Sequence, residues 1–218
     1  MAERFAETDS LEDEVMGSRD TLARLASRLN QANGFAGRLP SLIFVTDEKR
    51  IKDPLPSILG LPKGAAVILR HTKAGARAKL AAHIAPIARE RGLKLLIAGD
   101  AELASAVSAD GLHLPEARAR EAADVRARNP RWLITAAAHS AHALQVAKLA
   151  GADAALLAPV FATQSHPARA PLGLSRFLMM ARASPLPVYA LGGITGRNAS
   201  QIAGPMVAGL AAVSALAA

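Results

Sequence analysis

Short apolar runs recur along residues 42–213, and stretches of a different periodicity separate most of them. We predict eight strands, at Leu42–Thr46, Ala66–Arg70, Leu95–Ala98, Gly111–Leu114, Trp132–Ala137, Ala154–Leu157, Val188–Leu191 and Leu210–Val213. The intervening Ala/Leu/Arg stretches have a helical period, as in Arg77–Arg91, Ala101–Ser108, Ala141–Leu149 and Leu174–Arg182. Alternating strands and helices indicate βαβ crossovers and a parallel sheet. Eight strands spaced by about 24 residues favour an α/β fold of the closed (β/α)8, or TIM, barrel type.

An open, doubly wound sheet is the alternative architecture. Such a sheet normally has a glycine-rich turn after its first strand. Here the first predicted strand is followed by charged residues, Asp47-Glu48-Lys49-Arg50, and by no glycine. The barrel is therefore the preferred prediction.

The segment before the first strand predicts one extra amphipathic helix, from Ser10 to Asn30. Ser10 can cap the helix, and its apolar stripe consists of Leu11, Val15, Leu22, Leu25 and Leu29. We therefore divide the chain into an N-terminal helical extension, residues 1–38, and a barrel domain, residues 39–218. No complete helix follows the eighth strand, so the extra helix can cover the barrel face left bare there. A mobile arm and a dimer contact remain open alternatives.

The composition agrees with one large domain. Of the 218 residues 51% are hydrophobic but only 3% aromatic, so aliphatic side chains must supply the core. The chain has no cysteine, which excludes disulfides, thiol nucleophiles and thiolate metal sites. No apolar run approaches the roughly 20 residues of a membrane helix, and the acidic N-terminus does not resemble a secretory signal. We expect a cytoplasmic protein that does not bind a membrane.

The net charge of +8 is distributed unevenly. Residues 1–38 contain seven acids and five bases, so the body of the chain carries the positive charge. A basic body favours either nucleic acid or a small anionic ligand. With one Trp, one Tyr and five Phe the chain cannot build the stacking platforms of a nucleic-acid binder. We therefore expect a small phosphorylated substrate and no nucleic acid, and we leave a homo-oligomer open.

The turns after the seventh and eighth strands predict a phosphate site. In TIM barrels such sites favour these two loops. Gly192 and Gly193 let backbone N–H groups approach an anion without a Cβ in the way. After the eighth strand, Val213 and Ser214 open a short turn whose N–H groups and hydroxyl can face the same anion. The alternative is a plain barrel turn in which the glycines serve only the geometry.

Seven motifs occur in one order along the chain: Phe44-Val45-Thr46-Asp47, Leu69-Arg70, Gly111–Leu114, Ala138-His139-Ser140, Ala158–Thr163, Leu191–Ile194 and Val213–Ala215. In this order they resemble the thiamin phosphate synthase/TenI family over about residues 41–217. The resemblance implies a protein of thiamin biosynthesis that binds a thiazole phosphate at Gly192, Gly193, Val213 and Ser214. In the synthase branch, a hydroxymethylpyrimidine pyrophosphate is joined to that phosphate with Mg²⁺. The TenI branch aromatises a thiazole phosphate tautomer without a metal.

The chain departs from the synthase pattern at several positions. Ile68 replaces a Gln, Ala98-Gly99-Asp100 replaces an Asn-Asp pair, Pro115-Glu116-Ala117-Arg118 replaces Gly-Gln-Glu-Asp, Ala137 replaces a Ser, and Thr163-Gln164-Ser165-His166 replaces Thr-x-Thr-Lys. The resemblance still implies that Thr163, Ser165 and His166 contact the substrate. Mg²⁺ held by carboxylates normally neutralises a departing pyrophosphate. Asp100 and Glu116 are the candidates for a shifted metal site, with a surface Asp and a helix-start Glu as the alternatives.

Two further side chains are candidates for catalysis. His139 follows the fifth strand, and the resemblance to the TenI branch implies an acid/base role, which suits imidazole. A packed or capping histidine is the alternative. Arg70 ends the second strand and can grip an anion, or it can pair with Asp47 or Asp100. We expect His113, at the end of the fourth strand, to be packed or hydrogen-bonded.

These observations leave three functions open. A metal-independent, tautomerase-type proton transfer by His139 is preferred, with no cofactor. A Mg²⁺-dependent synthase would need Asp100 and Glu116 together at the rim. A non-catalytic phosphate-binding paralogue would fit a pocket closed by Ile68 and Leu114.

Overall fold

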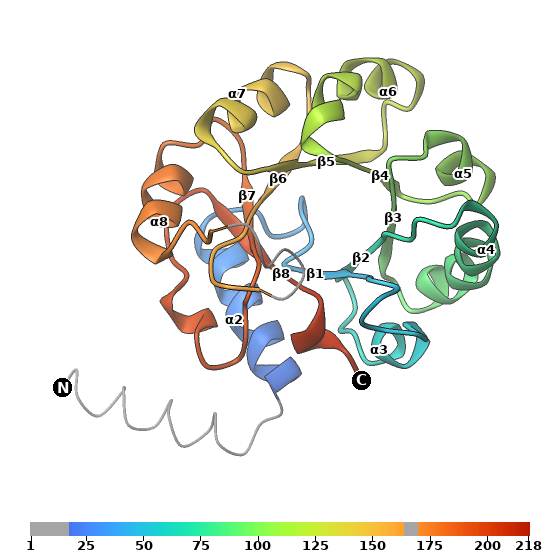
Figure 1. Ribbon diagram of the computed structural model, residues 1–218, viewed down its shortest axis with the longest axis horizontal. Coiled ribbons are helices and arrows are strands. Elements are labelled where there is room, and N and C mark those ends of the chain that lie inside the picture. The colour runs from blue at the N-terminus through green and yellow to red at the C-terminus, as the bar shows by residue number, and fades with distance from the viewer. Residues whose placement is uncertain (1–17, 164–169) are drawn as a thin grey trace.

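Eight parallel strands hydrogen-bond in chain order and close on themselves in the computed structural model, which describes residues 18–163 and 170–218 (Figure 1). The strands are β1 Leu42–Val45, β2 Ala66–Leu69, β3 Lys94–Ala98, β4 Gly111–Leu114, β5 Leu133–Ala138, β6 Ala154–Leu157, β7 Val188–Leu191 and β8 Val207–Ala212. The closing pair joins β8 to β1, with Leu42 opposite Leu210. The predicted (β/α)8 barrel is confirmed, and the open-sheet alternative is wrong.

Helices surround the barrel: α2 Ser18–Ala32, α3 Leu55–Leu59, α4 Ala74–Glu90, α5 Ala101–Ala106, α6 Ala122–Arg128, α7 Ala141–Leu149 and α8 Leu174–Arg182. In the described ranges, three 3-10 turns complete the connections, η1 Glu116–Glu121, η2 Ala199–Gln201 and η3 Ser214–Leu216. The short helix α3 has five residues, too few for the helical period to mark it in the sequence. None of the helices in the described ranges is long and apolar enough to cross a membrane.

The barrel strands are buried on both faces. Every residue of β1, β2, β4, β6 and β8 is buried, because helices cover the outside and side chains fill the inside. β8 begins at Val207, three residues before the predicted start at Leu210. The cause is Gly209, where a Cβ would lie 1.9 Å from the carbonyl oxygen of Ser41. A glycine that looks like a loop residue in the sequence thus allows the close approach that closes the barrel.

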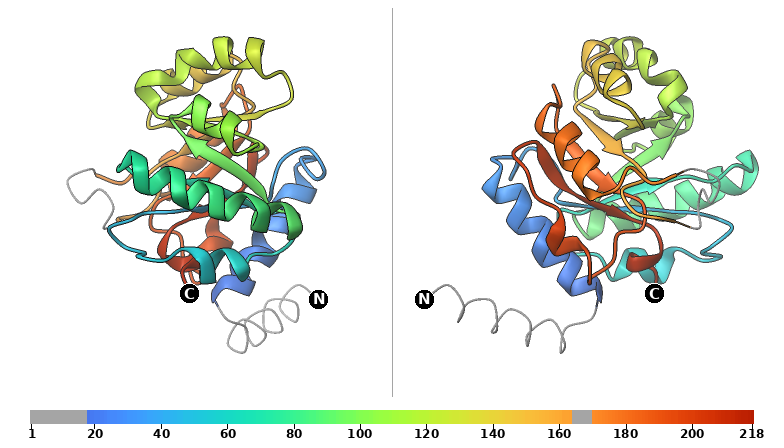
Figure 2. Two further views of the ribbon diagram at one scale, coloured as in Figure 1. Left: turned by 90° about the vertical axis from the view of Figure 1, so that its right-hand side faces the viewer. Right: turned by 60° about the vertical axis from the view of Figure 1, so that its left-hand side comes forward.

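Helix α2 lies along β8 and β1, as the two side views show (Figure 2). Leu22 and Ala26 of this helix are fully buried. The Asn30 Nδ2 atom donates hydrogen bonds to the carbonyl oxygens of Ala208, at 2.7 Å, and of Leu39, at 3.3 Å. This described part of the predicted Ser10–Asn30 helix therefore covers the barrel where only η3 follows β8.

The predicted start of that helix cannot be compared with the structure. Ser10, Leu11 and Val15 lie outside the described residues, and α2 starts at the first described residue, Ser18. At the other end α2 continues to Ala32, two residues beyond the predicted Asn30. The Asn33 Nδ2 atom then donates to the carbonyl oxygens of Gly204 and Val207, both at 2.9 Å. Side-chain amides thus fasten the end of α2 to the start of β8.

We expect Asn30→Ala to lower the free energy of unfolding by about 1–3 kcal/mol, because two carbonyl oxygens lose their donor in a buried position. The matched control is Gln31→Ala, which removes an exposed side chain that bonds to Ser27 and should change stability by less than about 0.5 kcal/mol. Urea denaturation followed by circular dichroism measures both. Equal stability of the two variants would mean that α2 is not fastened through Asn30.

Candidate functional site

A cavity of about 720 Å³ opens at the carboxyl ends of the strands, a volume typical of small-molecule sites. Its apolar wall comes from the strand ends and consists of Val45, Ala98, Ala137, Leu156, Leu191 and Ala212. Its polar lining comes from Ser18, Arg50, Arg70, His113, Glu116, His139, Thr163, Thr195 and Ser214. All eight strand ends meet at this edge of a closed parallel barrel, so residues distant in the sequence share one site.

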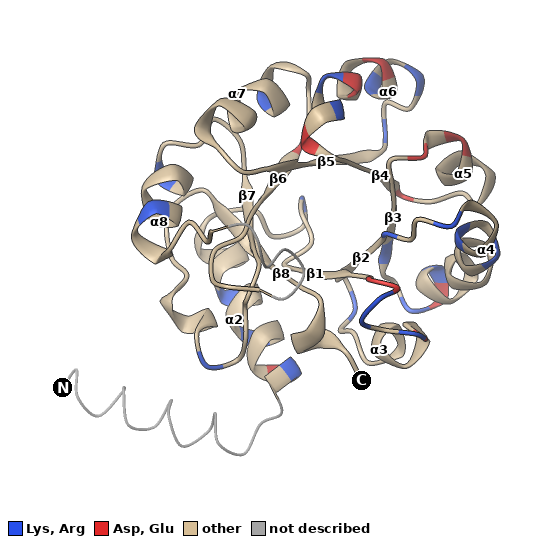
Figure 3. Ribbon diagram, viewed as in Figure 1, with Lys and Arg blue, Asp and Glu red and all other residues tan. Residues whose placement is uncertain are grey.

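The turns after β7 and β8 present unpaired backbone donors to the cavity. Gly193, Ile194, Ser214 and Ala215 all line it. Among the residues that the structure describes, no partner accepts a hydrogen bond from the N–H groups of these four. Residues 192–196 after β7 and 213–217 after β8 carry no charge, and the first charged residue after β7 is Arg197. Figure 3 shows how few charged residues lie on these two loops. An anion here would therefore be held by backbone dipoles and by the Ser214 hydroxyl, an arrangement known from phosphate sites.

The two glycines of the β7 turn have a packing role, which is the geometric role that the sequence left open beside anion binding. Both have positive φ, +99° at Gly192 and +65° at Gly193. A Cβ on Gly192 would lie 2.7 Å from the Cα of Pro159, and one on Gly193 would lie 2.5 Å from the carbonyl oxygen of Ala162. The added side chains would thus collide with the loop after β6. The glycines let these two loops touch, which in turn orients the N–H groups of the turn.

His139 lines the cavity at the end of β5, immediately before α7, which Ser140 caps. Its Nδ1 lies 2.6 Å from the carbonyl oxygen of Ala158. A carbonyl oxygen can only accept, so Nδ1 must carry the hydrogen and Nε2 of the neutral ring must be the bare acceptor. The backbone at the end of β6 therefore fixes the tautomer in which His139 can take up a proton.

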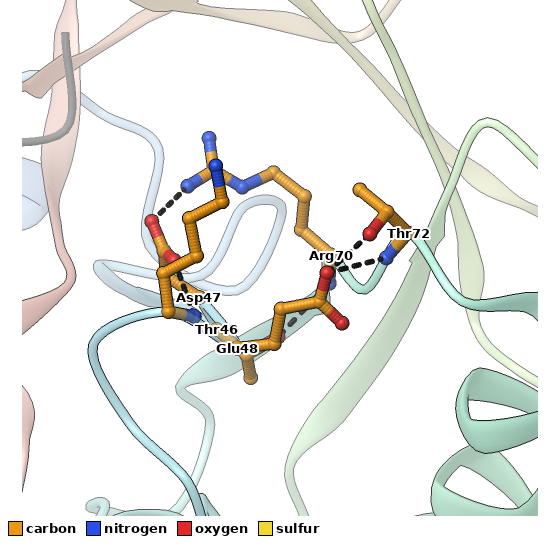
Figure 4. A network of polar contacts seen from close by, with 6 residues as sticks. Thr46, Asp47, Glu48, Arg70 and Thr72 are labelled. Carbon is orange, nitrogen blue, oxygen red and sulfur yellow. Dashed lines mark hydrogen bonds and ion pairs between the residues drawn. The ribbon is translucent and has the colours of Figure 1, made fainter.

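Arg70 belongs to a polar network on the rim after β1 and β2 (Figure 4). Its Nη2 donates to Oδ2 of Asp47 at 2.7 Å, and its backbone N–H donates to Oγ1 of Thr46 at 2.9 Å. Beside this pair, the Thr72 hydroxyl donates to the carboxylate of Glu48 and holds the pKa of that carboxyl below its usual value. We predicted Asp47 or Asp100 as the partner of Arg70, and in the structure the partner is Asp47. Arg70 still lines the cavity, so its remaining donors are available to a ligand.

The two carboxylates predicted as metal ligands have different surroundings. Oδ1 of Asp100 accepts from the Leu103 N–H at 2.9 Å and caps α5, while Oδ2 accepts from Arg77 Nη2 at 2.5 Å. Asp100 is also not part of the cavity wall, whereas Glu116 is. The described residues contain no group of three or more His, Cys, Asp or Glu side chains that could hold a metal ion. The pair as it stands does not fit a Mg²⁺ site.

His113 lies at the floor of the cavity and is 9% exposed. Its Nδ1 is 2.9 Å from Oγ1 of Thr135, so the expected packed and hydrogen-bonded histidine is present. Burial, and secondarily the charge of Arg70, lower its pKa to about 4. The ring is therefore neutral near pH 7 and adds no positive charge to the site.

The remaining predicted residues divide into three groups. Ile68 and Leu114 are fully buried and are not part of the cavity wall, so they do not close it. Thr163 lines the cavity. Ser165 and His166 lie outside the described residues.

Arg50 and Ser18 also line the cavity, although neither was predicted from the sequence. Arg50 could have been found as a basic residue shortly after the first strand. Ser18 reaches the rim only because α2 starts beside the β7 turn, where the Ser18 hydroxyl accepts a hydrogen bond from the Gly196 N–H at 3.3 Å. That contact joins residues 178 positions apart and leaves no pattern in the sequence.

A family model and curated relatives point to one family, and a solved structure shares the fold. The family model described as thiamine monophosphate synthase matches residues 42–216. A putative thiamine-phosphate synthase 2 of Aquifex aeolicus is 36% identical over 72% of this chain and 87% of its own. A thiamine-phosphate synthase of Chlorobium luteolum is 32% identical over 81% of this chain and 85% of its own. Among solved structures, a thiamine phosphate pyrophosphorylase from Pyrococcus furiosus has a TM-score of 0.65 at 23% identity, covering 79% of this chain and 85% of that one.

We expect Gly193→Ala to lower the free energy of unfolding by more than Gly34→Ala does. Both glycines have positive φ, +65° and +72°, so both substitutions strain the backbone at a cost of about 1 kcal/mol. Only at Gly193 would the new Cβ collide with a neighbouring loop, and nothing lies within 4 Å of it at Gly34. Thermal unfolding of the two variants measures the difference. Equal losses would show that the β6 and β7 loops do not need this contact.

Proposed function

The chain belongs to the thiamine monophosphate synthase family, and from this premise we propose that it binds a thiazole phosphate and catalyses a metal-independent proton transfer on the ring. The observation that carries the proposal is the geometry of His139. Its Nδ1–H is held by the Ala158 carbonyl, and its second nitrogen is left as an acceptor on a residue that lines the cavity. A general base needs this arrangement, with one ring nitrogen oriented and the other free.

The phosphate end of the ligand belongs at the turns after β7 and β8. The unpaired N–H groups of Gly193, Ile194, Ser214 and Ala215 support this assignment, since together they can bind the oxygens of one phosphate. Val213 supports the turn from a buried position. With the phosphate held there, the ring would lie over the apolar wall of the cavity, where Leu156 and Leu191 exclude water.

The proton transfer leaves the composition of the ligand unchanged. Nε2 of His139 takes a proton as a C–H bond of the ring system breaks, and the imidazolium then returns a proton to another atom of the same conjugated system. Throughout, the Nδ1–H bond to Ala158 keeps the ring in place. Arg70 can stabilise negative charge on the ligand between the two steps, and Asp47 holds its guanidinium in position. Thr163, together with Ser165 and His166, would contact the ligand from the loop after β6.

A second candidate is the Mg²⁺-dependent synthase, which the names of the similar proteins favour. That reaction would place Mg²⁺ beside a departing pyrophosphate to neutralise its charge. Ion pairing of Asp100 with Arg77 opposes this candidate, as do Ile68 and Ala137 at positions where synthases carry polar side chains. A phosphate-binding protein without catalysis is the remaining possibility, and the open cavity gives it no particular support.

The experiment supplies the thiazole phosphate tautomer and follows its conversion in the presence of EDTA. We expect activity to survive chelation and to fall about 10²–10⁴-fold in His139→Gln, the usual contribution of a positioned acid/base. His142→Gln is the matched control, because this exposed histidine three residues further on does not line the cavity.

A parallel assay supplies the pyrimidine pyrophosphate and the thiazole phosphate with and without Mg²⁺. We expect little thiamin phosphate. Robust product that disappears with EDTA would overturn the preference for the tautomerase. Inactivity in both assays, with phosphate still bound in a calorimetric titration, would leave the non-catalytic function.

A further inference from the structure

Glu116 places a carboxylate on the cavity wall, and its Oε2 atom has no hydrogen-bonding partner among the described residues. It directly follows Pro115 at the end of β4 and is the first residue of η1. Its side chain lines the cavity, and its Oε2 atom is buried with no hydrogen bond. Buried carboxylate oxygens in proteins are normally paired, so an unpaired one that faces a ligand cavity indicates a partner supplied by the ligand.

The basic side chains near this part of the rim have carboxylate partners of their own. Arg70 pairs with Asp47 at 2.7 Å. Arg77 pairs with Asp100 at 2.5 Å, and Arg118 pairs with Glu121 at 2.6 Å.

Arg50 and His113 also line the wall, and neither is a free positive charge beside Glu116. Arg50 has interactions of its own. The neighbouring His113 is neutral near pH 7, because burial lowers its pKa to about 4. The negative charge of Glu116 is thus available to a bound molecule.

Glu116 lies across the mouth from the proposed phosphate turns. In the closed order β1 to β8, three strands separate β4 from β8 in either direction around the barrel. A ligand whose phosphate sits at the β8 turn would therefore direct its other end toward β4. This step rests on the proposed function, since it takes the phosphate position from it.

The residue type narrows the chemistry further. A carboxylate only accepts hydrogen bonds, whereas an amide such as that of Gln both donates and accepts them. We propose that Glu116 determines specificity by binding an N–H donor, an amidine-like or protonated ring nitrogen, at the end of the ligand opposite its phosphate. The same carboxylate disfavours a ligand that carries a negative group there, because two like charges would share a partly dehydrated site.

The test compares three phosphate esters that differ only at the far end: 4-amidinobenzyl, 4-methylbenzyl and 4-carboxybenzyl phosphate. Isothermal titration calorimetry gives their dissociation constants with the full chain. We expect the amidine to bind about 10–100-fold more tightly than the methyl compound, the range of a charge-assisted hydrogen bond, and the carboxylate to bind most weakly.

Two variants show whether Glu116 is responsible. In Glu116→Gln the preference for the amidine should fall to less than about threefold, while the methyl compound should bind as before, which shows an intact cavity. Glu102→Gln removes the same charge from the exposed first turn of α5 and should leave the preference unchanged. A preference for the amidine that persists in Glu116→Gln would overturn the proposal.

The matching benzyl alcohols, which lack the phosphate, separate this proposal from the proposed function. If the phosphates bind more tightly than the alcohols but the amidine and methyl compounds bind equally, the assignment of Glu116 is wrong and the phosphate site stands. If phosphate adds nothing but the amidine alcohol still binds better than the methyl alcohol in a Glu116-dependent way, the phosphate site is wrong and Glu116 stands. No binding of any probe would overturn both.

Discussion

The site depends on the pairing of β8 with β1, because only a closed sheet brings all eight strand ends to one rim. The pairing requires Gly209, since any Cβ there would meet the Ser41 carbonyl, and the Leu210 N–H then donates to that same carbonyl at 3.1 Å. After β8 the chain has only the short turn η3, so no following helix covers the outside of this strand. α2 covers it and thereby carries Ser18 to the β7 turn. One close backbone contact thus connects barrel closure, the N-terminal helix and the rim.

The barrel could be predicted from the sequence because the same pattern, an apolar strand followed by a helix, repeats along the chain. Buried strands read as apolar runs, and eight of them at a regular spacing specify the architecture even when single limits are wrong. The start of β8 was missed because Ala208-Gly209 has no strand propensity. Its strand geometry comes from pairing with Val188 and Tyr189 of β7 and from the close approach of Gly209 to Ser41. Secondary structure that depends on a partner distant in the sequence is the part that local pattern cannot supply.

The candidate site was predictable to a different extent at each residue. His139 and Arg70 stand at strand ends, so their position on the rim follows from the fold once the strands are placed. Their partners do not follow, because the Ala158 carbonyl and the Asp47 carboxylate are chosen by side-chain orientation. Asp100 illustrates the same limit. Its place near the rim was predictable, but its ion pair with Arg77 was not, and that pair decides whether the carboxylate is available to a metal.

Most charged side chains near the rim form ion pairs within the protein. The few groups that are not paired therefore determine which ligands the cavity can distinguish. Asp47 and Asp100 are paired with arginines, so they contribute little net field to the cavity. The β7 and β8 turns attract an anion with uncharged N–H groups. Glu116 is the one carboxylate of the described cavity wall, and among the described residues nothing hydrogen-bonds to its Oε2 atom. A ligand is therefore oriented by two features on opposite sides of the rim, backbone donors after β7 and β8 and a single carboxylate after β4, with His139 between them immediately after β5.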